Sequence, residues 1–358
     1  MSAVAPAPPV RPSDYRDHRP LTERGLNLWE NHGWMSWDRP GGEDVLLWLS
    51  PYRLVGRQAG GPFAVDDVAL SQTLLLRGRF EDEARRRLED TPFLAVGYDL
   101  GDHLPGDALS ITIDDDRATW QIGDRVFTAA PPRWTIRGEH AGVDVDLEMT
   151  AMGPPFWLAD PTAPVEESEE RWFTQCARAR GTVRHNGTTF HIDGYASHER
   201  HVHCGTRYDP PKLLAASGVT WHSGSGEGIQ VIALSRPSLG RAWARLIFDD
   251  AVAEFRAPES TCRIDEVETW VDPASRLAVP SAWRASFSGA AGSLEIEARA
   301  YARAYYLWPH FRHGATVLYW WLADAEVRYA LVDGRQGSET FRYVVHDNRL
   351  LYRRHVDD

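Results

Sequence analysis

The densest group of ionisable side chains in this sequence lies in a run bounded by glycines, Gly194–Gly205. It holds one glutamate, Glu199, and three histidines, His198, His201 and His203. Carboxyl and imidazole groups are the side chains that most often move protons near neutral pH, and imidazole is also a common metal ligand. The run therefore predicts either acid–base chemistry or a metal site.

The acid–base interpretation assigns the leading role to Glu199. Burial against aromatic walls disfavours a charged carboxylate, so the protonated form of Glu199 would persist to higher pH and could act as a general acid. Such an acid could protonate an alkene or a leaving hydroxyl, and aromatic faces would stabilise the cation that develops. We predict Glu199, His201 and His198 as the catalytic residues.

The metal interpretation depends on the spacing of the histidines. His201 and His203 are two residues apart, so on a strand they share one face, and His191 or His198 could supply a third ligand. A cupin-like, metal-dependent enzyme is thus an alternative. We expect no metal, because no spacing in this set forces the third and fourth ligands to converge.

Aromatic residues are the second source of candidate site residues. The chain of 358 residues contains 15 Trp, a number that suits the walls of a cavity for a bulky apolar ligand. Neighbouring residues on a strand face opposite sides, so at most one of Trp320 and Trp321 can face such a cavity. The predicted substrate-binding residues are Tyr195, Arg200, His203, Trp34, Trp37, Trp221, Trp270, Trp283 and Trp320.

Several function classes are excluded or disfavoured by composition. The net charge of −12 and the absence of a basic run argue against a nucleic-acid partner. No P-loop, strand-linked GxGxxG or GxSxG motif occurs, and the glycine run Gly224–Gly228 is expected to be a loop, so no cofactor is predicted. Three separated cysteines indicate a reducing cytoplasm, and no apolar stretch approaches the roughly 20 residues of a membrane span. The sequence does not predict an oligomeric state.

Strand patterns dominate the chain. Residues 110–114 and 143–147 alternate between apolar and polar side chains, as half-buried strands do. Asn186-Gly187 lies in the middle of residues 181–192, which we expect to form a hairpin. This pair favours a two-residue turn with positive φ angles. Further strands are expected at 44–49, 69–76, 109–113, 118–122 and 143–149, with one surface helix at 81–89. Their regular spacing is typical of antiparallel barrels.

The domain organisation follows from this spacing. Residues 1–20 are rich in alanine and proline and are expected to form a flexible tail. Four prolines and an acidic patch between residues 153 and 170 mark a boundary. We therefore predict an N-terminal β-barrel over 21–170 and a C-terminal β-barrel over 171–358.

A family resemblance supports this all-β architecture. The segment from Trp270 to Val279-Pro280-Ser281-Ala282-Trp283 is similar to a Trp…Tyr-Pro-x-x-Trp pattern, with valine at the tyrosine position. That pattern occurs in the carotenoid 1,2-hydratase (hydroxyneurosporene synthase) and AttH-like group, which is related to lipocalin-fold Diels–Alderases. In that group a glycine-rich run with an acid and a histidine also precedes the tryptophans. The resemblance implies two lipocalin-like antiparallel β-barrels packed together.

The resemblance also implies an activity. We expect a cofactor-independent lyase or isomerase, a hydratase, dehydratase or cyclase, acting on a bulky hydrophobic isoprenoid or polyketide-like small molecule. A non-catalytic carrier that holds the same ligand is the competing class, because one cavity can serve either purpose. The choice between hydration, dehydration and cyclisation stays open.

Overall fold

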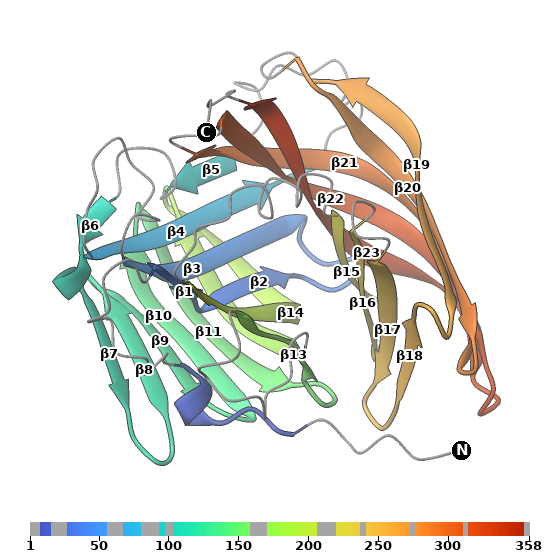
Figure 1. The fold of residues 1–358 in the computed structure, drawn as a ribbon, viewed down its shortest axis with the longest axis horizontal. Coiled ribbons are helices and arrows are strands. Elements are labelled where there is room, and N and C mark those ends of the chain that lie inside the picture. Colours follow the sequence, from blue (N-terminus) through green and yellow to red (C-terminus); the bar gives the residue numbers. More distant parts are fainter. Residues whose placement is uncertain are drawn as a thin grey trace. The chain divides into compact units, whose positions relative to one another are not determined.

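The computed structural model describes residues 8–15, 27–55, 67–79, 93–96, 103–157, 170–205, 220–236, 241–272, 276–310 and 314–353. This part of the chain contains no α-helix and is built from two antiparallel sheets (Figure 1). The predicted all-β class, with two barrel-like antiparallel sheets, is confirmed. The helix expected at 81–89 lies outside the described residues. No helix in the described part has the length and apolar character needed to cross a membrane.

The first sheet has 14 strands within the described residues, and its longest path runs β5-β4-β3-β1-β14-β13-β11-β10-β9-β8-β7. Two short 3-10 turns accompany it, η1 (Pro12–Tyr15) and η5 (Gly106–Ala108). Its strands are β1 (Asn27–Asn31), β2 (Gly33–Trp37), β3 (Val45–Val55), β4 (Asp67–Arg77), β5 (Phe93–Val96), β6 (His103–Pro105), β7 (Leu109–Ile113), β8 (Ala118–Ile122), β9 (Arg125–Ala130), β10 (Arg133–His140), β11 (Val143–Ala151), β12 (Phe156–Trp157), β13 (Glu170–His185) and β14 (Thr188–Gly205).

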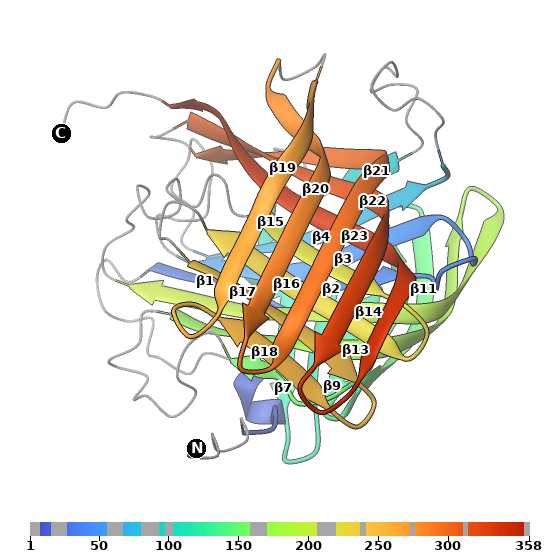
Figure 2. The ribbon, with the colours of Figure 1, turned by 90° about the vertical axis from the view of Figure 1, so that its right-hand side faces the viewer.

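The second sheet has nine strands within the described residues, in the order β18-β17-β16-β15-β23-β22-β21-β20-β19. Figure 2 shows β19 to β23 running side by side. The strands are β15 (Thr220–Ser225), β16 (Ile229–Arg236), β17 (Arg241–Phe248), β18 (Val252–Arg256), β19 (Thr261–Val271), β20 (Ala278–Gly289), β21 (Gly292–His310), β22 (Gly314–Leu331) and β23 (Gln336–Arg353).

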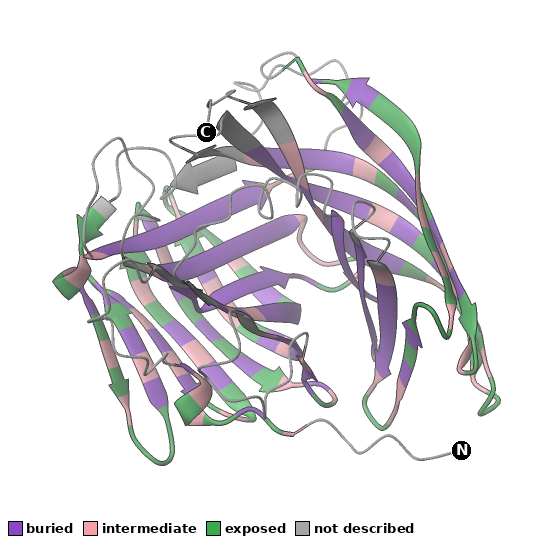
Figure 3. Ribbon diagram, in the orientation of Figure 1, coloured by how far each residue is buried: buried purple, intermediate pink, exposed green. Residues whose placement is uncertain are grey.

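Local sequence explains several of these elements. β7 and β8 match their expected bounds, and β11 alternates buried and exposed residues, which gives it one core face and one solvent face (Figure 3). The β13–β14 hairpin turns at Asn186 and Gly187, whose φ angles of 49° and 75° are the left-handed values expected for this pair. Alternation and turn chemistry therefore act together here.

The chain divides into two compact units, which differ from the predicted domains. Unit 1 comprises residues 1–37, 47–74 and 96–208, and unit 2 comprises 38–46, 75–95 and 209–358. The predicted boundary at 170/171 precedes β13 and β14, whereas both strands belong to unit 1, because β13 pairs with β11 and β14 pairs with β1. Residues 8–15, expected in the tail, are placed against unit 1, where η1 lies beside β7, β8 and β9.

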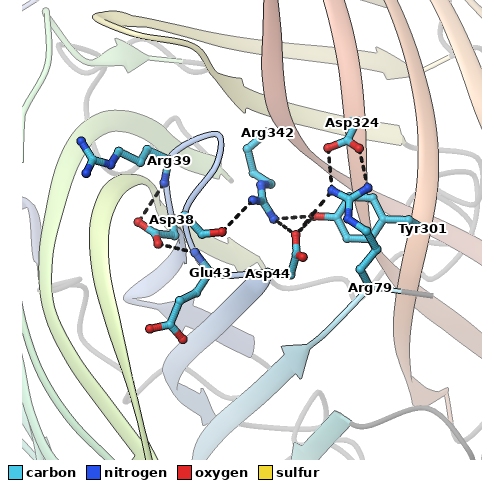
Figure 4. Close-up of polar contacts among 9 residues, drawn as sticks. Asp38, Arg39, Glu43, Asp44, Arg79, Tyr301, Asp324 and Arg342 are labelled. Carbon is cyan, nitrogen blue, oxygen red and sulfur yellow. Dashed lines mark hydrogen bonds and ion pairs between the residues drawn. The ribbon is translucent and has the colours of Figure 1, made fainter. Parts of the chain in front are cut away.

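Ion pairs hold the short segments 38–46 and 75–79 within unit 2 (Figure 4). The carboxylate of Asp44 accepts hydrogen bonds from Arg342 and from the Tyr301 hydroxyl, the latter at 3.0 Å. Arg79 donates two hydrogen bonds to Asp324, at 2.5 and 3.0 Å, and its guanidinium lies 3.8 Å from the centre of the Tyr301 ring. Arg79 and Asp324 are about half exposed, so the Asp44–Arg342 contact, where Arg342 is buried, has the better shielding from solvent.

Candidate functional site

The predicted catalytic residues lie on one strand, β14, but on both of its faces. His198 and Arg200 point to the face that also carries Trp34, which is opposite His198 in the register. Glu199 and His201 point to the other face, because side chains alternate along a strand. Most residues from 194 to 202 are buried, so both faces of this stretch are covered. The structure therefore brings Glu199 and His201 onto a shared face and leaves His198 on the opposite one.

Glu199 is half-buried and accepts a hydrogen bond from Asn31, whose side-chain amide is held in one orientation. The amide nitrogen of Asn31 donates a hydrogen bond to Glu199 Oε1 at 3.0 Å. The Asn31 oxygen accepts a hydrogen bond from the His201 backbone N–H at 2.8 Å, which fixes the orientation of the amide. Burial raises the pKa of Glu199 to about 7, and the bond from Asn31 opposes part of that rise. A carboxyl with this pKa exchanges its proton near neutral pH.

The surroundings of Glu199 are aromatic. His201 stacks on Trp172, with ring centres 4.9 Å apart and an angle of 18° between the planes. Trp37 is fully buried and faces Tyr195 in the register, on the same side of the sheet as Glu199. The Tyr195 hydroxyl accepts a hydrogen bond from Arg178 at 3.1 Å. This face thus combines a proton-exchanging acid with several ring faces.

The opposite face of β14 carries a hydrogen-bonded chain in the interior of unit 1. The indole of Trp134 donates to the Tyr15 hydroxyl at 2.6 Å, and that hydroxyl meets His198 Nε2 at 3.0 Å. His198 Nδ1 lies 2.7 Å from the carbonyl oxygen of Gly33. A carbonyl can only accept, so Nδ1 carries the proton and Tyr15 donates to Nε2. Trp34 stacks on the His198 ring at 4.3 Å.

Burial sets the protonation of this chain. It lowers the pKa of His198 to about 3, with the bond to Gly33 opposing the shift. It raises the pKa of the Tyr15 hydroxyl above its ordinary value. Both groups are therefore neutral at physiological pH and every proton in the chain has an acceptor. His32 lies 4.9 Å from His198, and burial lowers its pKa well below the ordinary value.

Arg200 is held by a buried ion pair and does not contact Glu199. Its guanidinium donates to Glu30 at 2.6 Å, and both side chains are almost fully buried. It also donates to the backbone carbonyl groups of Asp14, Asn31 and His201 at 3.0–3.1 Å. With these contacts Arg200 ties η1, β1 and β14 together.

The predicted tryptophans of unit 2 fall into two groups. Trp270 and Trp283 lie in its core, and each contacts Trp321, with ring centres 6.3 and 6.0 Å apart. Trp320 lies on the other face of β22, stacked on His346 at 4.0 Å. Trp321 therefore lies in the core cluster of unit 2, and the role of Trp320 in substrate binding stays a prediction. Trp221 packs edge-on against Trp243.

No metal site is found among the described residues, where no three His, Cys, Asp or Glu side chains gather in a way that could hold an ion. His191 is exposed, while His198 and His201 point to opposite faces of β14. For His203 only the strand position is described, opposite Glu170 and Trp29. Among the described residues, His191, His198 and His201 therefore do not gather around one point, and the metal site with His203 is not tested.

Sequence reasoning missed several residues of these interiors. Tyr15 and Trp134 in unit 1, and His222 and Tyr343 in unit 2, are all buried. Tyr15 stands in an alanine- and proline-rich segment that carries no periodic signal. His222 could have been predicted more easily than Tyr15. It follows Trp221 and precedes a glycine-rich run, and neighbouring aromatic residues also identified the other candidates.

Comparison with solved structures identifies the fold. An AttH, provisionally assigned, from Nitrosomonas europaea matches with a TM-score of 0.53 and 15% identity over 89% of this chain and 92% of that one. CghA with Sch210972 matches with a TM-score of 0.55 and 13% identity, over 91% and 89% of the two chains. Kievitone hydratase from Nectria haematococca matches with a TM-score of 0.50 and 13% identity, over 96% and 94%. A scan of protein-family models and a search of curated protein sequences gave no match. The chain shares the fold of these three proteins, as its sequence resemblance implies.

Proposed function

We propose that this protein is a cofactor-independent lyase or isomerase in which Glu199 is the general acid. The observation that carries the proposal is the half-buried Glu199 carboxyl, oriented by Asn31, with its pKa raised to about 7 by burial. An acid with a pKa near the working pH is present in both forms and can give and regain a proton within one cycle.

The reaction that fits this group is the addition or removal of water at a carbon–carbon double bond, or a proton-initiated cyclisation. In hydration, protonated Glu199 gives its proton to one alkene carbon and a cation forms at the other. Water attacks that carbon and its extra proton returns to the Glu199 carboxylate, so the net change is the addition of one water. Trp172, His201 and Trp37 lie on the same side of β14 as Glu199, and an aromatic ring face there would stabilise positive charge on a bulky apolar substrate.

The fold comparisons support this class of reaction by analogy. One structural neighbour is named as a hydratase, and another was solved with a small molecule, Sch210972. Folds host many activities, so the role of Glu199 is argued from its own surroundings. The abundance of tryptophan favours a bulky apolar substrate, and the family resemblance implies an isoprenoid or polyketide-like polyene.

The test measures proton transfer directly. We expect the wild-type protein to incorporate deuterium from D₂O into an isoprenoid alkene panel containing lycopene, farnesol and linalool, detected by mass spectrometry. Glu199→Gln should reduce this exchange about 100-fold or more, because it cannot deliver a proton. The wild-type rate should fall as the pH rises through about 7, where Glu199 loses its proton. Asp193→Asn, an exposed change on the same strand, is the matched control.

A carrier would behave differently. It would bind a member of the panel without exchange in the wild-type protein, and Glu199→Gln would leave that binding unchanged. That outcome would contradict the enzymatic role and favour the non-catalytic alternative. Equal exchange by the wild type and Glu199→Gln would show that Glu199 is not the acid.

A further inference from the structure

The interior of unit 2 contains a second aromatic cluster, built around His222 on β15. The His222 ring lies 5.7 Å from Tyr343 on β23 and 6.1 Å from Trp283 on β20, measured between ring centres. Trp283 in turn lies 6.0 Å from Trp321 on β22. In the sheet order β15 and β20 are separated by three strands, so the contact between His222 and Trp283 crosses the interior of the curled sheet.

The polar atoms of this cluster lack hydrogen-bond partners among the described residues. They are both ring nitrogens of His222, the Tyr343 hydroxyl and the indole nitrogens of Trp283 and Trp321. All four side chains are at least 98% buried. Buried polar groups are nearly always paired, because an unpaired one has lost its hydrogen bonds to water without replacement. Five such atoms on neighbouring rings therefore favour a hydrogen-bonding partner from outside the described residues.

The backbone at Gly224 leaves room for the Tyr343 ring. Gly224 stands opposite Tyr343 in the register, and a Cβ added at Gly224 would lie 2.3 Å from Cδ2 of the Tyr343 ring. Any other residue at 224 would push the ring away. The first part of the run Gly224–Gly228, expected to be a loop, thus belongs to β15 and makes room for Tyr343.

The charges of the interior indicate what kind of partner fits. Burial lowers the pKa of His222 to about 3, so its ring is neutral at physiological pH. Buried Asp272 accepts a hydrogen bond from Tyr319 at 2.5 Å, and the buried Arg303 guanidinium lies 3.7 Å from the centre of the Trp270 ring. Asp347 accepts from Arg349 at 2.6 Å. Two carboxylates and two arginines therefore lie near this cluster, which favours a neutral ligand over an ionic one.

We propose that the interior of unit 2 binds a neutral small molecule with an apolar body and an oxygen that accepts hydrogen bonds, such as a ketone. The indole N–H groups of Trp283 and Trp321 and the Tyr343 hydroxyl are the unpaired donors from which this oxygen would accept. His222 has one donor and one acceptor nitrogen, so it also accommodates a hydroxyl on the ligand. The surrounding core is hydrophobic and covers the apolar body. This inference is independent of the acid chemistry of Glu199, because its readout is equilibrium binding.

The experiment compares matched pairs of probes that differ in one oxygen. Acetophenone and 2-acetylnaphthalene are tested against ethylbenzene and 2-ethylnaphthalene by isothermal titration calorimetry with the full chain. We expect at least one ketone to bind about 10-fold tighter than its hydrocarbon partner. It should also shift the indole N–H signal of Trp283 or Trp321 in a ¹H–¹⁵N NMR spectrum, assigned with Trp283→Phe and Trp321→Phe.

Single-atom variants locate the site. Tyr343→Phe removes a hydroxyl that has no partner among the described residues, so it should fold, and it should weaken ketone binding about 3- to 10-fold while leaving the hydrocarbon unchanged. Tyr329→Phe, whose hydroxyl contacts Glu339 instead, is the matched control and should change neither affinity. Equal affinity of ketone and hydrocarbon, no binding of either ketone, or insensitivity to both Tyr343→Phe and Trp321→Phe would overturn the proposal.

Discussion

Each unit buries a neutral histidine among tryptophans, but the two histidines differ in their hydrogen bonds. His198 in unit 1 donates to Gly33 and accepts from Tyr15, which accepts from Trp134. His222 in unit 2 has no hydrogen-bond partner among the described residues. The same burial lowers the pKa of both rings to about 3. Burial and aromatic packing therefore do not by themselves distinguish structure from binding.

The difference in pairing assigns the two interiors different roles. A satisfied chain of hydrogen bonds in a low-dielectric interior rigidifies its surroundings, and removing one member leaves the others unpaired. An unsatisfied set lowers stability and is expected where a ligand completes the hydrogen bonds. The hydrogen-bonded chain around His198 is therefore architectural, although His32 and Trp34 beside it also have buried ring nitrogens without partners among the described residues. In unit 2 the His222 cluster contains no comparable chain, and its polar atoms stay unpaired among the described residues.

Removal of Arg200 should give the largest effect in unit 1. Arg200→Met keeps the length of the side chain but leaves the Glu30 carboxylate buried without its 2.6 Å partner. Breaking one side of a buried ion pair costs about 3–5 kcal/mol. We expect a loss of that size in the free energy of unfolding, measured by urea denaturation.

Two controls test the reason for this loss. Glu30→Gln combined with Arg200→Met should destabilise less than the sum of the single changes, because both single changes break the same buried ion pair. Arg180→Met breaks the exposed Arg180–Asp193 pair and should cost less than about 1 kcal/mol. Equal losses at both arginines would contradict the role of burial.

Tyr15→Phe should give the next largest effect. It deletes one oxygen and leaves both the Trp134 indole N–H and His198 Nε2 unpaired in the interior. Leaving buried polar groups unsatisfied costs about 1–3 kcal/mol. The loss should appear in urea denaturation, together with a shifted indole N–H signal of Trp134 in NMR. A variant as stable as the wild type would show that the chain is not an architectural element.

Parts of this comparison were predictable from sequence. The alternation in β11 and the Asn186-Gly187 turn gave the correct local structure because one face of those strands is solvated and the turn needs positive φ angles. Burial raises the pKa of Glu199, as predicted, because desolvation disfavours the charged carboxylate. Its catalytic role stays a prediction.

Other features depend on contacts that no local pattern contains. β14 is buried on both faces along residues 194–198, so polar residues occur on each side and alternation could not say that His198 and Glu199 point apart. Tyr15 acquires its role only through partners more than 100 residues away. The placement of Trp321 in the core cluster of unit 2 required the register between β22 and its neighbours.

The pH dependence of the free energy of unfolding should contain a contribution from His222. The pKa of folded His222 is about 3, against about 6.5 for a free histidine, so the unfolded chain binds an extra proton between these values. Stability is thus lost as the pH falls below about 6.5, by up to about 1.4 kcal/mol per pH unit from this group. His222→Phe removes that proton uptake, so its stability relative to the wild type should rise steadily between pH 7 and pH 5.

Trp243→Phe is the control for this pH series. It changes a buried ring of unit 2 without changing a titratable group, so its difference from the wild type should be the same at pH 5 and pH 7. Parallel behaviour of His222→Phe and Trp243→Phe would contradict the assignment of a buried, neutral His222.

The smallest expected effect is also the one that separates the two interiors most clearly. Tyr343→Phe makes the same chemical change as Tyr15→Phe, but the Tyr343 hydroxyl has no hydrogen-bond partner among the described residues. Deleting an unsatisfied buried hydroxyl removes a desolvation penalty and no bond, so the ligand-free protein should gain up to about 1 kcal/mol. Opposite signs for the two Tyr→Phe changes in urea denaturation would establish that unit 1 depends on its buried hydroxyl and unit 2 does not. A loss of 1 kcal/mol or more for Tyr343→Phe would mean that a bound water already satisfies the hydroxyl, and the two interiors would then be equivalent.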